Sequence, residues 1–146
     1  MDPFDFPAFE KIPTMINGFR LMCEIGTGAN GTVRLAKRKI EGSQELQEEK
    51  CCCKIITKSN IITENERQFF HSEIEALSII THPNIAAFID FCEDDENYYI
   101  FQEYCQGISL LNYVTNKHKL SETEAARLLI QLLQALSYLH SMKIAH

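Results

Sequence analysis

The stretch FRLMCEIGTGANGTVRL, residues 19–35, decides the fold of this chain. Residues 19–25 and 32–35 alternate apolar with polar side chains, apart from one methionine, and this period of two is typical of β-strands. Three glycines, Gly26, Gly28 and Gly31, lie between the two segments with the spacing G-x-G-x-x-G. The stretch therefore predicts a β-hairpin with a glycine-rich turn, in which backbone N–H groups can approach phosphate oxygens.

The glycine spacing alone has other interpretations, namely a flexible turn or a dinucleotide-binding fold. In the dinucleotide-binding fold the third glycine opens a helix, and an acidic residue follows about 20 positions later. Here Gly31 opens a β-branched strand, and the nearest suitable acids, Glu48 and Glu49, lie in a charged stretch. The sequence therefore disfavours the dinucleotide-binding fold and leaves the flexible turn and the phosphate-binding loop open.

The chain after the hairpin predicts three more strands and one helix. Residues 37–50 are polar and mixed in charge and predict a solvated loop, whereas the apolar run at 51–56 suits a covered strand. Thr63 and Glu66 have the spacing of a capping box, and helical periodicity continues to about Ile80. The two further strands are predicted at residues 86–92 and 98–103. The result is a five-stranded sheet with one inserted helix.

Beyond Gly107 the sequence predicts helices. Residues 110–114 predict a short helix, and Ser121 with Glu124 forms a second capping box at the start of a long one. Apolar side chains wrap most of the circumference of the long helix, which calls for burial on several sides. Because the printed residues end soon afterwards, the sequence predicts a core larger than these 146 residues supply.

Length and composition exclude several classes of protein. A chain of 146 residues fits one compact domain, and 45% hydrophobic with 23% charged residues argues against disorder. The net charge is −6 and the longest Lys/Arg run is residues 37–39, so no nucleic-acid partner is predicted. The longest apolar run, residues 85–89, is far shorter than the ~20 residues that cross a bilayer, so no membrane segment is predicted.

The six cysteines predict small buried side chains, not disulfides. Three are consecutive, at residues 51–53, and no C-x-x-C pair occurs, a usage that suits a reducing compartment. Residues 1–7 are acidic at their start and broken by proline, and they lack the basic and apolar regions of a secretory signal. The sequence therefore predicts a cytoplasmic protein.

Lys54 and Glu73 are two charged residues in unusual predicted environments. By alternation Lys54 shares a strand face with Cys52 and Ile56, so its ammonium either reaches solvent or pairs with a buried anion. At ~100° per residue Glu73 falls inside the apolar stripe of its helix, unless the helix is rotated enough to bring it to the edge. A pair between Lys54 and Glu73 accounts for both positions.

These motifs, in this order, resemble the amino-terminal part of a eukaryotic protein kinase domain of the serine/threonine type. The segments KIITK at residues 54–58 and YCQGISL at residues 104–110 are similar to those of calcium/calmodulin-dependent and AMP-activated kinases. The glycine-rich hairpin resembles the loop that covers ATP. The segment CCCK at residues 51–54 resembles the family's V-A-I-K motif, and HSEIEAL at residues 71–77 resembles its αC helix. YIFQEYCQG at 99–107 resembles the last small-lobe strand and the hinge, and His146 matches the histidine of His-Arg-Asp.

The resemblance implies an α+β fold in three parts. Residues 1–18 are an N-terminal extension, and residues 19–104 are the kinase small lobe with a five-stranded antiparallel sheet plus the αC helix. Residues 105–146 are the hinge and the truncated start of the helical large lobe, with its first helices αD and αE.

The resemblance also implies roles for particular residues. Lys54 holds the α- and β-phosphates of ATP and forms the catalytic ion pair with Glu73. Gln102 is the gatekeeper, and backbone groups of Glu103 and Cys105 face the adenine edge. Further nucleotide contacts are implied for Cys52 above the adenine, Ser109 at the ribose, and the loop residues Ile25, Gly26, Thr27, Gly28, Ala29, Asn30, Gly31 and Val33. A complete kinase also uses Mg²⁺, but no metal ligand is implied within these residues.

Two functions from different classes remain open. In the first, these residues are the ATP-binding part of a protein kinase that phosphorylates serine or threonine in protein substrates. They lack the family's catalytic Asp and its metal-binding Asn and Asp, so the 146 residues alone are predicted to transfer no phosphate. In the second, the chain is a regulatory binding module that associates with a protein partner or with itself through an exposed helix at residues 121–141.

Overall fold

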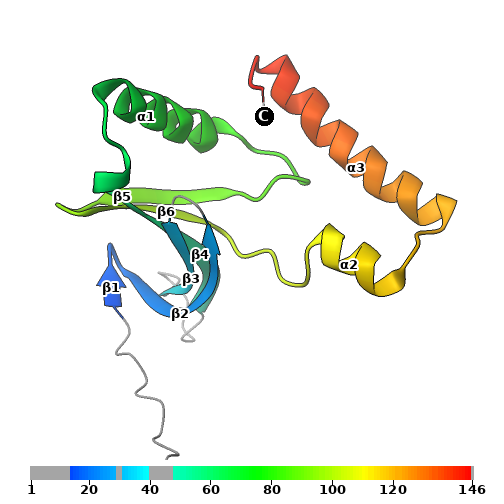
Figure 1. Ribbon diagram of the computed structural model, residues 1–146, viewed down its shortest axis with the longest axis horizontal. Helices are drawn as coiled ribbons and strands as arrows, with labels where there is room; N and C mark the ends of the chain where they lie inside the picture. The colour runs from blue at the N-terminus through cyan, green and yellow to red at the C-terminus, as the bar shows by residue number, and fades with distance from the viewer. Residues whose placement is uncertain (1–13, 29–30, 40–47, 146) are drawn as a thin grey trace, which may run out of the picture.

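The computed structural model describes residues 14–28, 31–39 and 48–145. They form an antiparallel sheet with the strand order β1-β2-β3-β4-β6-β5 and three α-helices. The strands are β1 Thr14–Ile16, β2 Phe19–Gly28, β3 Gly31–Lys39, β4 Glu48–Thr57, β5 Phe88–Glu93 and β6 Asn97–Glu103. The helices are α1 Glu64–Ile79, α2 Leu110–Lys117 and α3 Glu122–Ser141, with a 3₁₀ turn at Lys58–Asn60. Figure 1 shows a curled sheet with α1 beside β5 and β6.

The α+β fold is confirmed, but the sheet has six strands where five were predicted. The additional strand, β1, lies within the predicted N-terminal extension and pairs with β2. Asn17 and Gly18 join the two strands with φ angles of 46° and 80°, which are the left-handed values that tight hairpin turns require. The prediction missed β1 because three residues are too few to show a period of two.

The alternation predicted for residues 19–25 holds only in its first half. Phe19 and Leu21 are each 1% exposed, whereas Cys23 is exposed and Ile25 is 44% exposed. The β2–β3 register shifts between Leu21 and Glu24, and the Arg34 Nε donates a hydrogen bond of 2.8 Å to the Met22 carbonyl oxygen. An irregularity of this kind moves the following side chains to the other face of a strand. The apolar pattern alone did not reveal it.

The charged stretch at 37–50 is not wholly a loop, because its two ends extend β3 and β4. Arg38 is paired with Glu49 in the register, and the two side chains form an ion pair of 2.9 Å. Glu48 accepts from Arg20 at 2.7 Å and from Lys37 at 2.9 Å. Cross-strand pairs of opposite charge stabilise a polar strand pair. The mixed charge of this stretch therefore belongs in part to two paired strands, and its prediction as a loop was wrong there. Residues 40–47 lie outside the described residues.

The interior of the curled sheet is a small apolar core. The rings of Phe19 and Phe101 stack with their centroids 3.9 Å apart, and Leu21, Cys51 and Cys53 are buried around them. The predicted burial is confirmed for these two cysteines, but Cys23 and Cys105 are exposed. All six thiols are free, as predicted. Burial raises the pKa of Cys51 to about 11 and that of Cys53 to about 12.

A second apolar cluster joins α1 to the sheet. Ile74 is the buried residue of α1, and it clusters with Ile56, Tyr98 and Ile100 of the sheet. The rings of Phe70 and Tyr98 lie 4.5 Å apart between centroids. The helix begins with the predicted capping box: the Glu66 amide donates to Thr63 Oγ1 at 3.2 Å, and the Thr63 amide donates to Glu66 Oε2 at 2.8 Å. These bonds hold the pKa of Glu66 below its usual range.

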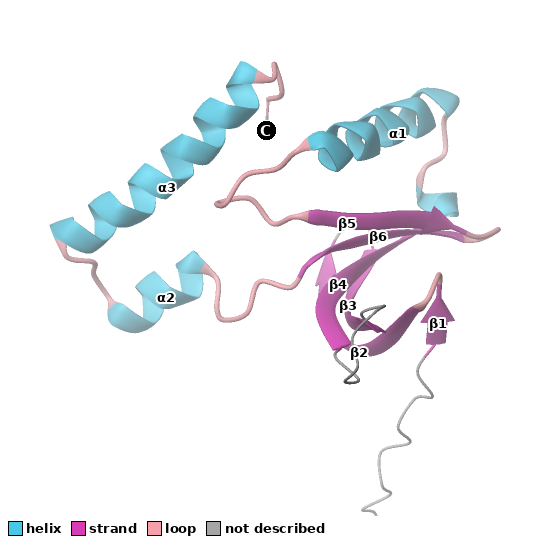
Figure 2. Ribbon diagram, turned by 180° about the vertical axis from the view of Figure 1, so that it is seen from behind, coloured by secondary structure: helices cyan, strands magenta, loops and turns pink. Residues whose placement is uncertain are grey.

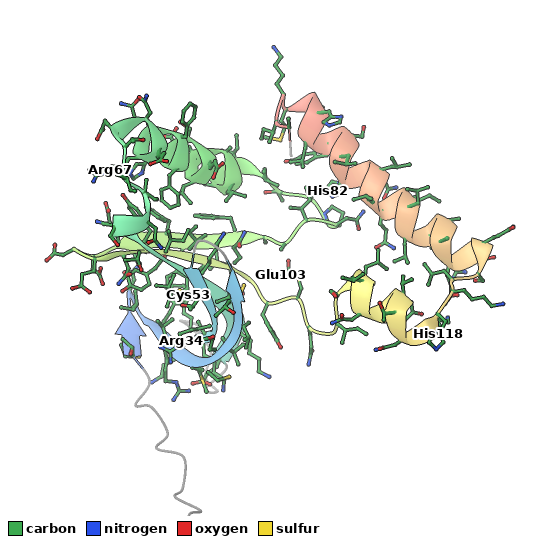
Figure 3. The ribbon with its side chains drawn as sticks, in the orientation of Figure 1. Arg34, Cys53, Arg67, His82, Glu103 and His118 are labelled. Atoms are coloured by element: carbon green, nitrogen blue, oxygen red, sulfur yellow. The ribbon has the colours of Figure 1, made fainter. Side chains whose placement is uncertain are left out.

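Helices α2 and α3 lie to one side of the sheet, beyond the segment that leaves β6 (Figure 2). The loop before β5 contacts α3: Thr81 donates its amide proton to the Tyr138 hydroxyl at 3.0 Å, and the Asn84 side-chain amide donates to Gln134 Oε1 at 3.2 Å. The His82 ring, labelled in Figure 3, lies 5.2 Å from that of Tyr138. Within the part of the chain that the structure describes, no helix is long and apolar enough to cross a membrane.

We expect the Thr63→Ala substitution to lower the free energy of unfolding by about 1 kcal/mol, because the amide at the third position of α1 loses its cap. Urea denaturation followed by circular dichroism measures this loss. Thr57→Ala is the matched control, since Thr57 precedes the 3₁₀ turn without a side-chain cap bond. Equal losses in the two variants would contradict the energetic role of the capping box.

Candidate functional site

The tip of the β2–β3 hairpin packs closely on β4. Gly28 and Gly31 face each other at the tip, and Thr32 is the register partner of Ile55. Gly31 has a φ of 153°, and a Cβ atom added to it would lie 1.9 Å from the Ile55 carbonyl oxygen. Glycine is therefore required at position 31 to bring the hairpin against β4. The predicted loop residues Ala29 and Asn30 lie outside the described residues.

Strand β4 carries Lys54 to the face predicted by alternation. Val33 is the cross-strand neighbour of Lys54 on one side, and Ile100 on the other. The side chains of Cys51 and Cys53 point into the curled sheet, as Figure 3 shows for Cys53, while Cys52 and Lys54 are half-buried on the opposite face. The strand thus separates an apolar core from a face that carries a positive charge.

A cavity of about 390 Å³ opens on this face between α1 and strands β4 and β6. It brings together three predicted site residues, Lys54, Glu73 and Gln102. Its apolar wall comes from the two strands, α1 and the residue that follows the 3₁₀ turn, and the residues are Ile56, Ile61, Phe69, Phe70, Ile74, Leu77 and Ile100. The helical periodicity of residues 69–80 indicated several of these side chains as core, but no sequence signal marked them as the wall of a site.

The prediction that Glu73 faces the core is wrong. Glu73 is exposed at the edge of the cavity, whereas Ile74 is buried and Phe70 and Leu77 are half-buried. The helix therefore has the rotation given as the alternative in the prediction, with Glu73 at the margin of its apolar stripe. A carboxylate at the margin keeps its hydration and avoids the desolvation cost of the interior.

Lys54 and Glu73 share the cavity without an ion pair. The ion pairs within 4.0 Å among the described residues do not include one between these two side chains. Lys54 is thus a half-buried ammonium beside apolar side chains. An ammonium at such a place can pair with an anionic group of a ligand.

The segment that follows β6 carries backbone groups beside the same sheet face. The Cys52 thiol donates a hydrogen bond of 3.6 Å to the Glu103 carbonyl oxygen, and the Glu103 amide donates to the Ala87 carbonyl oxygen at 2.8 Å. Among the hydrogen bonds of the described residues, none uses the backbone amide or carbonyl group of Cys105. A donor and an acceptor in this segment therefore remain available for a planar ligand edge.

Some predicted site residues do not join the cavity. Ser109 begins α2, where its hydroxyl oxygen accepts from the Asn112 amide at 3.2 Å, and it does not line the cavity. Ile25, Gly26 and Thr27 are exposed on β2 and do not line it either. Helix capping decides the orientation of Ser109.

The fold and the site together define the small lobe of a protein-kinase-like protein: a curled antiparallel sheet with one packed helix, a glycine-rich hairpin and a strand lysine facing that helix. The family model of the protein kinase domain matches residues 19–146, and the chain belongs to the protein kinase family.

Curated relatives extend over most of this chain. It is 33% identical to the serine/threonine-protein kinase ppk6 of Schizosaccharomyces pombe over 94% of its length. It is 31% identical over 97% of its length to the human hormonally up-regulated neu tumor-associated kinase, and 36% identical over 84% to the CDPK-related kinase 7 of Arabidopsis thaliana. The chain spans 18%, 19% and 21% of these three relatives, respectively.

We expect Gly31→Ala to destabilise the hairpin, because the new methyl group would overlap the Ile55 carbonyl oxygen. The loss in free energy of unfolding should reach about 1–3 kcal/mol, the cost of a strained backbone position. Gly26→Ala is the matched control, since a Cβ atom there meets nothing within 4 Å. Chemical denaturation of both variants measures the difference, and an unchanged stability for Gly31→Ala would contradict the close packing.

Proposed function

We propose that this chain is the ATP-binding part of a protein kinase that phosphorylates serine or threonine residues in protein substrates. In this proposal residues 19–104 act as the small lobe, and residues 105–146 act as the hinge and the start of the large lobe. The names of the curated relatives support the serine/threonine class. The family resemblance supports ATP as the ligand.

The observation that carries the proposal is the half-buried Lys54 without a carboxylate partner, next to the glycine-rich hairpin. Its cross-strand neighbour Val33 is two residues from Gly31, so the hairpin and the ammonium flank the same region. Phosphate oxygens are the anions that such a pair of groups binds, through backbone N–H donors and one point charge. The free backbone groups at Cys105 suit the adenine edge.

Glu73 acts as a positioning residue in this proposal. Because Glu73 and Lys54 line one cavity, a modest movement of α1 toward β4 would bring the carboxylate to the ammonium. The pair would then hold the Lys54 side chain in one orientation toward the phosphates. Among the described residues Glu73 forms no ion pair, so this movement would break none.

The residues that the structure describes do not fit a magnesium site. No group of three or more His, Cys, Asp or Glu side chains among them could hold a metal ion. We propose that these 146 residues alone bind nucleotide without transferring its phosphate. Positioning of the hydroxyl and neutralisation of the phosphates require groups that these residues do not supply.

We expect Lys54→Ala to weaken the binding of a fluorescent ATP analogue by about tenfold or more, since it removes a charge-assisted hydrogen bond. A fluorescence titration of the purified chain measures the dissociation constant. Lys50→Ala is the matched control, because Lys50 lies on the same strand but is exposed outside the cavity. Equal affinities for the two variants would contradict the proposed role of Lys54.

The same preparation tests the absence of phosphate transfer. Radiolabelled ATP and a general protein substrate should give no labelled protein above the level seen without the chain. Turnover by the original chain that disappears in Lys54→Ala would contradict this part of the proposal.

A second candidate function, a binding module, is favoured by the apolar face of α3. Leu129, Ile130, Leu132 and Leu133 are 53–55% exposed, and Ala135 is the buried residue of this helix. Exposed apolar patches of this kind mark association surfaces. We propose that the chain self-associates or meets a protein partner through this face.

We expect sedimentation velocity to show concentration-dependent self-association of the chain. The double substitution Leu129→Gln and Leu133→Gln should shift the distribution toward monomer, because it removes apolar area from the contact. Leu111→Gln is the matched control, since Leu111 is 75% exposed on α2. A strictly monomeric original chain would contradict self-association.

A further inference from the structure

Two thiols lie close to the junction between the sheet and the segment that leads to α2. Cys52 is the register partner of Gln102, and its thiol contacts the Glu103 carbonyl oxygen at 3.6 Å. Cys105 follows Glu103 by two residues and is exposed. Figure 3 labels Glu103 where the chain leaves the sheet for α2. One thiol is therefore anchored on β4, and the other is carried by the segment beside it.

The backbone around Cys105 is not held in a helix or a strand. Residues 104–109 form neither helix nor strand, and Gly107 within them has a φ of 123°. Segments of this kind move more readily than the ladder that holds Cys52. A disulfide needs Cβ atoms about 3.5–4.5 Å apart, so the bond requires this segment to bring Cys105 to that distance from Cys52.

The other cysteines of β4 are oriented differently. Cys51 and Cys53 are 1% and 0% exposed inside the curled sheet, so they face away from Cys105. The alternation of the strand thus presents one thiol of three to the segment after β6. The direction of the side chains on β4 therefore decides that Cys52, and not Cys51 or Cys53, can react with Cys105.

We propose that Cys52 and Cys105 form a disulfide under mild oxidation by hydrogen peroxide, and that this bond is a reversible modification site. The exposed Cys105 thiol reacts first: one peroxide oxidises it to a sulfenic acid and releases one water. The Cys52 thiolate then attacks the Cys105 sulfur, the S–S bond forms, and the hydroxide that leaves takes up the Cys52 proton as a second water. Two thiols are oxidised, and one peroxide is reduced to two waters.

The second step should depend on pH in a direction that the environment of Cys52 sets. Burial raises the pKa of Cys52 above its ordinary value, and this effect remains after Cys105 has become a sulfenic acid. The thiolate is the attacking form, and its fraction grows as pH rises toward that pKa. The rate of cross-linking should therefore increase from neutral to alkaline pH.

The bond would join β4 to the segment that carries the free backbone groups of Cys105. Because we propose that these groups face adenine, the cross-linked chain should bind nucleotide less well than the reduced chain. This consequence rests on the proposed function, whereas formation of the disulfide does not.

Peptide mapping by mass spectrometry tests the inference on the full chain, after brief treatment with hydrogen peroxide and blocking of the remaining thiols. The expected product is a Cys52–Cys105 cross-linked peptide pair that dithiothreitol separates, with the pH dependence given above. Cys105→Ser and Cys52→Ala should each abolish it, and Cys23→Ser, which removes an exposed thiol of β2, should leave it unchanged. Denatured chain supplies the reference for unselective pairing.

Several results would overturn the inference. One is the oxidation of Cys105 to a sulfinic acid while Cys52 stays reduced. Another is a disulfide between the Cys105 residues of two chains. A third is the same mixture of cysteine pairs in the folded and the denatured chain. A parallel titration with the fluorescent ATP analogue separates the two proposals. If the reduced chain binds no nucleotide, the proposed function fails, while the peptide map still decides whether the disulfide forms.

Discussion

The stacking of Phe19 on Phe101 is the contact on which the rest of the structure depends. The two rings lie 3.9 Å apart between centroids and belong to β2 and β6, strands that two others separate in the sheet. A flat sheet could not bring them together, so their burial with Leu21 and the β4 cysteines requires the curl. At the two edges of the sheet, the Asn17 side-chain amide donates to Asp90 Oδ2 at 3.0 Å, which ties the first turn to β5.

Because the sheet is curled, one face of β4 lies in the apolar core and the other faces the candidate site. Cys51 and Cys53 fill the concave interior, where small side chains are needed beside the stacked rings. Cys52 and Lys54 face the other way, toward α1 and the segment after β6. The hairpin reaches this region because position 31 lacks a Cβ atom. One strand with strict alternation therefore links the stability of the core to the placement of the charged site.

Helix α3 contacts the loop before β5 through side-chain hydrogen bonds and the neighbouring rings of His82 and Tyr138. The loop before β5 meets α3 through the hydroxyl of Tyr138 and the side-chain amide of Asn84. These bonds orient the helix but cover little of its apolar surface, so four large side chains remain more than half exposed. Hydrogen bonds set the direction of such a helix, whereas burial of apolar area supplies most of its stabilisation. The chain spans about a fifth of the relatives it matches.

The sequence by itself determined the elements and the order of the motifs, because capping boxes, alternation and glycine spacing are local properties. Both capping boxes, five of the six strands and the free cysteines were predicted correctly. Only the tertiary structure decided the bulge after Leu21, the short β1 and the rotation of α1 that exposes Glu73. Each of these features depends on the strand or helix that packs against the segment. The periodicity of a single segment carries no information about that neighbour. The cavity shared by Lys54 and Glu73 arises in the same way, from contacts between segments that no local pattern describes.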